Sequence, residues 1–394
     1  MYTDSFNTQL VRKNTGAIKY DRIKTDFGTE NILPMWVADM DIPVPPFIME
    51  AIQTRCQHPI LGYTLIPERW YQSILNWLAQ RYQWEVQKQE IGFLPGIVSG
   101  IALAIQCFSK PGDRILIQSP VYPPFRYLPK ANGRELVENS LVYRNNQFEI
   151  DFEDFEEKAA SGCRMFILCS PHNPGGRVWS KEALERMLAI CAAHDICVVS
   201  DEIHADLTLP GHQHHPAAMV ETSDCALITL MAPSKTFNIP GLNSSFYVIQ
   251  NESVRTQFDR FLQNLSLNHG NLFAYEATVA AYEQGAVWLE ELTRYLQTNI
   301  DYVVAFLKAH IPQITCSIPQ ASFLIWLDCR NLGMNQKELE TFFIHEAGLG
   351  LNTGTSFGPE GYGFMRLNIG CPIETLQLAM SQLKSAIKQV KTDQ

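Results

Sequence analysis

Polar side chains follow three separate apolar runs of the sequence, close to the point where each run ends. Asn173, Asp201 and Lys235 each come within five residues of the end of such a run. The runs have the composition of buried parallel strands, and ligands of open α/β sheets bind beyond the carboxyl ends of the strands. We therefore expect an amide, a carboxylate and an amine to lie together at one edge of a sheet.

This combination suits pyridoxal phosphate. Lys235 would form the Schiff base, Asp201 would hold the pyridine nitrogen protonated, and Asn173 would bond the phenolic oxygen. A protonated pyridine ring is an electron sink for a carbanion at the α-carbon of an amino acid. Each residue alone has an ordinary explanation as a helix cap, a solvated lysine or a turn. Their order along three successive strands favours the cofactor site.

A glycine ahead of a helical pattern offers a place for the phosphate. Gly96 precedes the helical run Ile101–Ile105. Glycine at such a point lets a phosphate approach the free amides and the positive end of the helix dipole. We expect Gly96, Ile97 and Val98 to bind the phosphate. The P-loop pattern GxxxxGK[ST] and the dinucleotide pattern GxGxxG find no proper match.

The elements that must position these residues alternate between strands and helices, which predicts an α/β fold with a parallel sheet. The expected strands are residues 114–118, 164–169, 196–200 and 225–230, with a helix over 181–188. After about residue 290 the pattern changes to that of a smaller α+β domain. Its expected elements are a strand at 320–327, a helix near 336–346, a strand near 363–369 and a helix near 375–390.

Three segments follow from this pattern. Residues 46–289 are expected to form the large cofactor-binding α/β domain, and residues 290–394 the small C-terminal α+β domain. Residues 1–45 are expected to pack with the small domain.

Composition and charge exclude several classes of protein. Charged residues make up 18% of the 394 residues, against about 25% in an average soluble protein, so much apolar material must be buried. The net charge is 31 − 41 = −10, and an acidic chain without a basic run is a poor nucleic-acid binder. No uninterrupted apolar stretch reaches the length of a membrane span.

The scattered cysteines indicate a reducing compartment, and the histidine-rich segment does not have the pattern of a metal site. The ten cysteines are scattered and no pair has CxxC spacing, so we expect buried free thiols and a cytoplasmic protein. The start of the chain lacks the features of a signal peptide. The segment 211–216 (GHQHHP) has no carboxylate or Cys at ligand spacing, so we expect a solvated loop rather than a metal site.

Taken together, these residues resemble those of fold-type I pyridoxal phosphate enzymes of the class I and II aminotransferase group. Over essentially its whole length, the chain is similar to carbon–sulfur β-lyases of the PatB/MalY type (cystathionine β-lyase). The segments typical of that branch are 35–41 (MWVADMD), 62–64 (GYT), 201–204 (DEIH) and 364–372 (FMRLNIGCP). The resemblance implies the aspartate aminotransferase-like fold, with a large domain built on a mostly parallel sheet and a smaller α+β domain.

The resemblance also implies roles for further residues. Tyr122 would stack on the pyridine ring, and Arg366 would hold the substrate α-carboxylate bidentately, as the guanidinium fork allows. The backbone near Ala38 would close over that carboxylate, next to Asn173. Tyr63 would reach the cofactor phosphate of the neighbouring subunit, which implies a homodimer with shared active sites.

Three positions depart from the wider group. His204 stands where many aminotransferases have Tyr, Ala232 where they often have a phosphate-binding Ser or Thr, and Asn243 where they often have Arg. The cofactor would therefore have His204 as a different neighbour. Its phosphate would depend on the amides of residues 96–98, on Ser234 and on Tyr63 of the partner subunit.

The activity that the resemblance implies is β-elimination from a cysteine thioether such as cystathionine, giving pyruvate, ammonia and a thiol. Lys235 would remove the Cα proton while Arg366 holds the carboxylate. Lys235, Tyr122 or Tyr63 of the partner subunit would protonate the departing thiolate.

Two alternatives use the same fold. An aminotransferase needs the same Lys, Asp, Asn and Arg, and differs in returning the proton to the cofactor instead of expelling a β-substituent. A non-catalytic pyridoxal phosphate sensor would follow a DNA-binding domain. It is disfavoured because the fold is expected to begin near residue 1 and because Lys235 and Arg366 are both present. The physiological thioether and any protein partner stay open.

Overall fold

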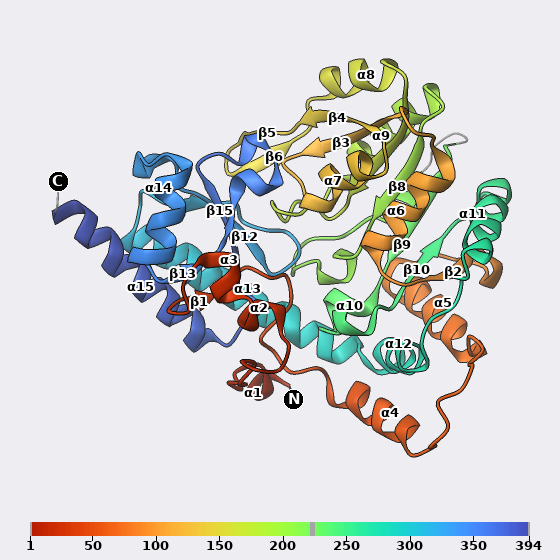
Figure 1. The fold of residues 1–394 in the computed structure, drawn as a ribbon, viewed down its shortest axis with the longest axis horizontal. Coiled ribbons are helices and arrows are strands. Elements are labelled where there is room, and N and C mark those ends of the chain that lie inside the picture. The colour runs from red at the N-terminus through yellow and green to blue at the C-terminus, as the bar shows by residue number, and fades with distance from the viewer. Residues whose placement is uncertain (1, 221–224, 393–394) are drawn as a thin grey trace.

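A seven-stranded β-sheet lies at the centre of the larger part of the molecule (Figure 1). In spatial order its strands are β2 (Ile91–Leu94), β10 (Ser245–Val248), β9 (Leu227–Met231), β8 (Cys197–Asp201), β7 (Cys163–Cys169), β3 (Arg114–Ser119) and β4 (Glu135–Ser140). The run from β9 to β4 is parallel, whereas β10 is antiparallel to both of its neighbours. The computed structural model describes residues 2–220 and 225–392; residues 1 and 393–394, the outer ends of the first and last predicted segments, lie outside them.

Helices cover both faces of this sheet. One face packs against α6 (Ile97–Phe108), α7 (Pro123–Ala131) and α11 (Glu252–Asn264), and the other against α8 (Phe152–Ala160) and α9 (Lys181–Ala193). Ile115 and Ile117 of β3 point into the first core and Leu116 into the second. Because both faces are buried, the strands are apolar without alternation. The predicted α/β architecture is confirmed.

A second, antiparallel sheet forms the smaller part of the molecule. Its strands in order are β11 (Thr315–Cys316), β12 (Leu324–Asp328), β15 (Phe364–Asn368) and β14 (Asn352–Thr353). The long helices α13 (Ala286–His310) and α15 (Ile373–Thr392) pack with it in one core. Helix α13 passes without a break through residue 290, so the expected boundary falls inside a helix, and the division into three segments stays a prediction.

The remaining elements complete the two parts. Helices α4 (Pro46–Cys56), α5 (Glu68–Tyr82) and α12 (Leu272–Gln284) pack together beside the large sheet. Short elements are α10 (Pro233–Thr236), α14 (Gln336–Thr341) and the hairpin of β5 (Val142–Arg144) and β6 (Gln147–Glu149). None of the described helices combines the length and apolarity that crossing a bilayer requires.

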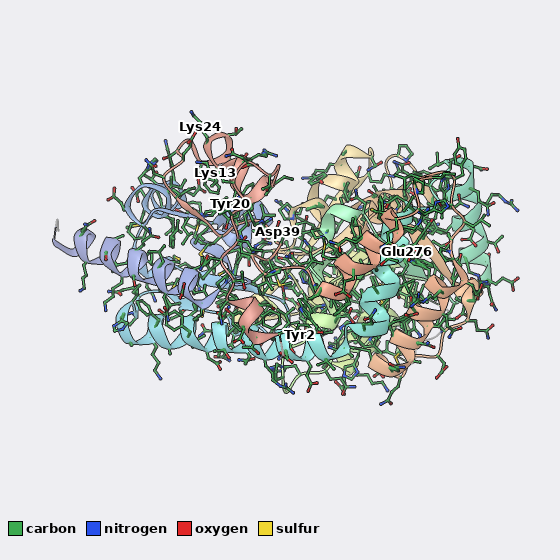
Figure 2. The ribbon with its side chains drawn as sticks, turned by 90° about the horizontal axis from the view of Figure 1, so that it is seen from below. Tyr2, Lys13, Tyr20, Lys24, Asp39 and Glu276 are labelled. Carbon is green, nitrogen blue, oxygen red and sulfur yellow. The ribbon has the colours of Figure 1, made fainter. Side chains whose placement is uncertain are left out.

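The N-terminal segment lies against the smaller part. It contains α1 (Thr3–Phe6), α2 (Ile18–Asp21), α3 (Ile23–Phe27) and β1 (Leu33–Pro34), which pairs in parallel with β13 (Leu349–Gly350). The ring of Phe6 packs on Trp288 and Tyr295 of α13, with centroid distances of 5.6 and 5.4 Å. In Figure 2, Lys24 and Lys13 lie on the outside of this segment and Asp39 lies nearer the middle of the molecule.

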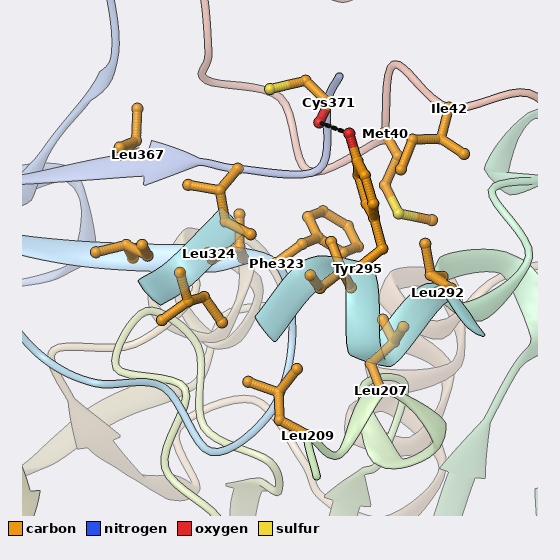
Figure 3. Packing of buried hydrophobic residues seen from close by; sticks show 14 of the residues in the cluster. Met40, Ile42, Leu207, Leu209, Leu292, Tyr295, Phe323, Leu324, Leu367 and Cys371 are labelled. Carbon is orange, nitrogen blue, oxygen red and sulfur yellow. Dashed lines mark hydrogen bonds between the residues drawn. The ribbon is translucent and has the colours of Figure 1, made fainter. Parts of the chain in front are cut away.

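One apolar core joins the two parts. Leu207 and Leu209, which follow β8, belong to the same buried cluster as Leu292 and Tyr295 of α13 and Phe323 (Figure 3). Segments distant in the sequence therefore meet at the residues that follow β8, the strand that ends with Asp201.

The predicted strand at 320–327 was wrong in its first half, since β12 begins at Leu324. The N–H groups of Gln320 and Ala321 both donate to the carbonyl of Gly176, at 2.8 and 3.1 Å. Ser322 has a left-handed φ of 77°. These residues turn to dock on the loop after β7, and this tertiary contact overrides their strand-like pattern.

The expectation of a solvated histidine loop at 211–216 was wrong for His214. Its Nε2 lies 2.7 Å from Oε2 of Glu202, and both side chains are buried. Glu202 follows β8 directly, so its carboxylate enters the interior and needs donors. His214 provides one, and the hydroxyl of Ser200 and the N–H of Ala217 provide two more.

Candidate active site

A cavity of about 220 Å³ opens at the carboxyl ends of β7, β8 and β9. The structure brings ten of the twelve predicted site residues to its wall: Ala38, Gly96, Ile97, Val98, Tyr122, Asn173, Asp201, His204, Ser234 and Lys235. Of the other two, Arg366 contacts Asn173 just beyond the wall. Tyr63 is fully exposed on the loop between α4 and α5, away from this cavity.

Asp201 is the last residue of β8 and is buried at the cavity wall. Its Oδ1 accepts the N–H of Ile203 at 3.1 Å. Burial raises the pKa of this carboxyl group to about 7, although that backbone hydrogen bond works in the opposite direction. A buried carboxylate in this position favours a cationic N–H partner in the cavity, which the protonated pyridine nitrogen of the predicted cofactor would supply.

Lys235 lies in α10, directly after β9, and its side chain reaches into the same cavity. Its Nζ donates a hydrogen bond to the carbonyl oxygen of Ala38 at 2.5 Å. Burial lowers the pKa of this amine to about 8. A large fraction is therefore neutral near pH 8, the form that adds to an aldehyde and accepts a proton.

Arg366 of β15 is buried among neutral acceptors. Its Nη1 donates to Oδ1 of Asn173 at 3.0 Å, and its Nη2 donates to the carbonyl of Trp36 and to Oδ1 of Asn352, at 2.9 and 2.6 Å. Among the described residues, its buried Nε has no hydrogen-bond partner. Burial lowers the pKa of Arg366 to about 10. A buried cation without a carboxylate at hand is a suitable receptor for a ligand carboxylate.

The phosphate end of the cavity is formed by the start of α6. Gly96 caps this helix with a left-handed φ of 135°, and the N–H of Gly100 makes the first bond of the helix, to the Gly96 carbonyl. The N–H groups of residues 97–99 therefore stay available for a phosphate. Ser99 and Asn243 line the same cavity. Sequence reasoning missed Ser99, and it treated Asn243 only as a lost arginine although its amide can donate.

His204 and Tyr122 complete the wall. The buried His204 has its pKa lowered to about 3 by burial, and next by the positive charges of Lys235 and Arg366, so the ring is neutral. Its Nδ1 finds no hydrogen-bond partner among the described residues. The N–H of Tyr122 donates to the Asn173 carbonyl at 3.0 Å, which ties two wall loops together. Burial also raises the pKa of the Tyr122 hydroxyl.

These groups fit pyridoxal phosphate. A half-buried amine, a buried carboxylate and free helix amides surround one cavity, and a guanidinium lies at its border. Sequence reasoning missed Asn352, whose side chain orients Arg366 from 14 residues away. The signal available was one Asn in the Gly-rich segment 348–354, which suggests a turn as readily as a ligand-binding strand.

Comparison with known proteins agrees with this geometry. Residues 35–383 match the family described as aminotransferase class I and II. Cystathionine beta-lyase PatB of Bacillus subtilis is 40% identical over 97% of this chain and 100% of its own length. Cystalysin from Treponema denticola, whose crystal structure contains pyridoxal 5'-phosphate, aligns with a TM-score of 0.94 and 32% identity, over 98% of this chain and 99% of its own. A C-S lyase from Staphylococcus hominis, bound to pyridoxal phosphate and L-cycloserine, aligns with a TM-score of 0.91 and 31% identity, over 97% of this chain and 98% of its own.

Proposed function

The chain belongs to the class I and II aminotransferase family, and on this premise we propose that it is a pyridoxal phosphate-dependent carbon–sulfur β-lyase of the cystathionine β-lyase type. The observation that carries the proposal is the placement of Lys235 and Asp201 in one cavity, with Arg366 at its border and without a carboxylate partner in the described part of the chain. The full-length similarity to a cystathionine β-lyase supports the choice of reaction.

The residues that hold the cofactor follow from the cavity. Lys235 would hold it covalently, Asp201 would accept its ring N–H, and Asn173 and Tyr122, which line the same cavity, would lie against it. The amides of residues 96–98 and the hydroxyl of Ser234 would receive its phosphate. When bound, pyridoxal phosphate withdraws electrons from the α-carbon of an amino acid attached to it.

The protein's own groups then carry out the proton transfers. Arg366 binds the substrate carboxylate, and its neutral neighbours leave its charge free for that purpose. The amine of Lys235, whose pKa is lowered to about 8 by burial, is the base that takes the proton from the α-carbon of the substrate. Lys235 or Tyr122 returns a proton to the sulfur as the Cβ–S bond breaks. With one water molecule, the thioether yields a thiol, pyruvate and ammonia.

The first test is Lys235→Ala. The variant should lose the visible absorbance of the lysine-linked cofactor and reduce lyase turnover by at least about a thousandfold, because both covalent attachment and the base are removed. Lys88→Ala is the matched control, since Lys88 lies on the surface and pairs with Glu68. Lyase activity retained in Lys235→Ala would refute the assignment.

The second test separates elimination from transamination. Purified protein is mixed with cystathionine in the absence of any keto acid, and pyruvate and homocysteine are measured. We expect both products to accumulate over many turnovers. A strict requirement for a keto acid would instead identify an aminotransferase, which uses the same Lys, Asp, Asn and Arg.

We also infer that the active form is a homodimer with shared sites. The loop between α4 and α5 exposes Ile60, Leu61, Tyr63 and Leu65, the last with 89% of its surface accessible in the single chain. Exposed apolar side chains gathered on one loop favour burial against a second subunit. Tyr63 would then reach the phosphate end of the partner's cavity.

The ten unpaired cysteines support a cytoplasmic location.

A further inference from the structure

Residues 36–42 form a strap that touches both cationic side chains of the site. The carbonyl of Trp36 accepts a hydrogen bond from Arg366 at 2.9 Å, and the carbonyl of Ala38 accepts one from Lys235 at 2.5 Å. The strap therefore contributes one of the hydrogen bonds that hold the guanidinium of Arg366 and the one that holds the amine of Lys235.

Two asparagines hold the strap through its main chain. Asn368 donates to the carbonyls of Val37 and Asp39, at 2.5 and 2.7 Å. Asn238 donates to the carbonyls of Met40 and Ile42, and its Oδ1 accepts the N–H of Met40. These contacts fix the inner side of the strap.

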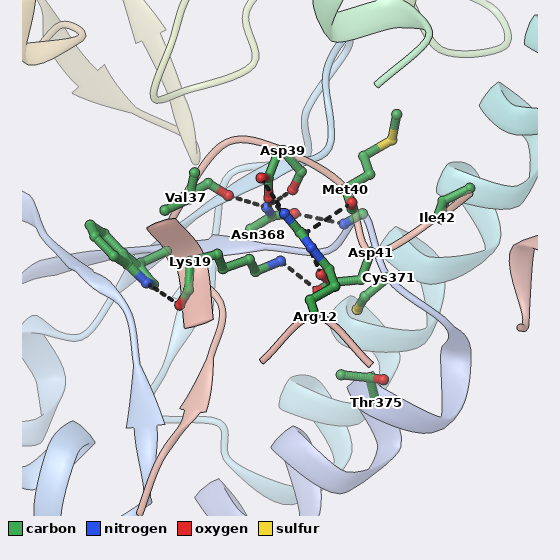
Figure 4. Close-up of polar contacts among 12 residues, drawn as sticks. Arg12, Lys19, Val37, Asp39, Met40, Asp41, Ile42, Asn368, Cys371 and Thr375 are labelled. Atoms are coloured by element: carbon green, nitrogen blue, oxygen red, sulfur yellow. Dashed lines mark hydrogen bonds and ion pairs between the residues drawn. The ribbon is translucent and has the colours of Figure 1, made fainter. Parts of the chain in front are cut away.

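The outer side of the strap is held by the N-terminal segment (Figure 4). Arg12 binds Asp39 with both Nη atoms, at 3.0 and 2.6 Å, and its Nη1 also lies 2.6 Å from Oδ1 of Asp41. Lys19 is buried and pairs with the other oxygen of Asp41 at 2.6 Å. Two cations and two carboxylates thus form one network, in which the side chain of Asp39 is only 16% exposed. Such a bidentate, partly buried network is stronger than an isolated surface ion pair.

We propose that Arg12 is a positioning residue of the active site, which fixes the strap over Lys235 and Arg366 and neutralises the Asp39 carboxylate next to Ala38. This inference rests on the proposed function, because it assigns Arg12 a role through Lys235 and Arg366. Arg12 itself lies outside the cavity wall.

The charges near Lys235 determine in which direction its pKa should change when Arg12 or Asp39 is replaced. Besides burial, the charged groups that act on Lys235 are Asp39 on the strap, Arg366 on β15 and Asp201 on β8; His204 nearby is neutral. Asp39 and Asp201 raise the pKa of Lys235, and Arg366 lowers it. Removing Arg12 leaves the charge of Asp39 unopposed, so Arg12→Met should raise this pKa. Removing the charge of Asp39 should lower it.

The experiment uses the cofactor-loaded protein and four variants: Arg12→Met, Arg12→Lys, Asp39→Asn and the control Arg22→Met. Arg22 lies on the same N-terminal segment, where it pairs with Asp26 on the surface. The first readout is the pH midpoint of the visible absorbance change of the lysine-linked cofactor, which needs no turnover. We expect Arg12→Met to raise this midpoint by about half a pH unit and Asp39→Asn to lower it by a similar amount.

The second readout is steady-state kinetics with cystathionine. Arg12→Met should raise KM roughly tenfold with a smaller effect on kcat, because the displaced strap misplaces Arg366. Arg12→Lys keeps the charge and loses the fork, so it should restore the pH midpoint while KM stays raised. Arg22→Met should match the unmodified protein in both readouts.

pH midpoints that shift in the same direction in Arg12→Met and Asp39→Asn would overturn the inference. A strap that is only loosened would change the midpoint in the same way in both variants, whereas the charge argument requires opposite shifts. A midpoint and KM unchanged in Arg12→Met would overturn it as well. If Arg12→Met does not fold, a KM that is unchanged in Arg12→Lys, or a pH midpoint that is not lowered in Asp39→Asn, would overturn the inference. Failure of the unmodified protein to bind the cofactor or to cleave cystathionine would refute the proposed function instead.

Discussion

At the scale of single residues, Arg366 shows how a buried charge can be kept ready for a ligand. Its partners are one backbone carbonyl and the amide oxygens of Asn173 and Asn352. Amide oxygens satisfy the N–H groups without neutralising the cation. A carboxylate at the same place would pair with the guanidinium permanently and compete with the substrate.

This argument predicts that two substitutions of Asn352 have different effects on substrate binding. Asn352→Asp should raise KM for cystathionine by about one to two orders of magnitude, because the new carboxylate pairs with Arg366. Asn352→Ala removes one hydrogen bond and leaves the charge free, so its effect on KM should be several times smaller. Steady-state kinetics of the two variants measure the difference. Equal KM values would show that the charge at this position has no effect on substrate binding.

At the scale of elements, His172 joins two loops that carry site residues. Its Nε2–H donates to the carbonyl of Pro120 at 2.8 Å, after β3, and its ring packs between Phe148 and Trp179. Burial lowers the pKa of His172 from 6.5 to about 4. The loop after β7 is therefore held by a histidine that must stay neutral in the folded protein.

The consequence is a defined dependence of stability on pH. Between pH 6.5 and about 4, His172 binds a proton in the unfolded chain but not in the folded one, so the free energy of unfolding falls as the pH falls. The loss from this residue should be about 3 kcal/mol over that range. Urea unfolding of the cofactor-free protein at several pH values measures it.

The control for this prediction is His172→Gln, which should show a smaller decrease over the same range. Asp201 acts in the opposite direction, because burial raises its pKa to about 7, and His204 acts in the same direction as His172. Both residues are present in the two proteins, so the difference between the curves isolates His172. Curves of equal slope would contradict the assigned state of this ring.

At the scale of the whole molecule, the sequence predicts the site residues that follow strands. It does not predict the residues whose roles depend on contacts between distant segments. Asn173, Asp201 and Lys235 could be placed together because each follows a parallel strand, and parallel strands end at one edge. Asn238, Asn352 and the burial of His214 could not. Their roles depend on contacts with segments that only the folded chain brings near, such as Met40, 198 residues from Asn238.

The proposed dimer is also a property of the whole molecule. Replacing Leu61 and Leu65 by Asp should convert the dimer to monomers in analytical ultracentrifugation, because charges are costly in an apolar interface. The monomer should also retain less cofactor in dialysis, since Tyr63 no longer reaches a second site. Leu378→Asp is the control, because Leu378 is a similarly exposed leucine on α15. A monomeric unmodified protein with full activity would contradict the shared site.

The strap over the cavity has a consequence for how this protein can diverge. Its carbonyls at residues 36–40 and 42 each accept a hydrogen bond from a side chain elsewhere. The path of the strap is thus encoded by its surroundings and does not depend on its own side chains at Val37 and Ala38. Of these two residues Ala38 lines the cavity, so a mutation there should alter the shape offered to a substrate while Lys235 and Arg366 keep their supports. New substrate preferences can arise there without loss of the catalytic geometry.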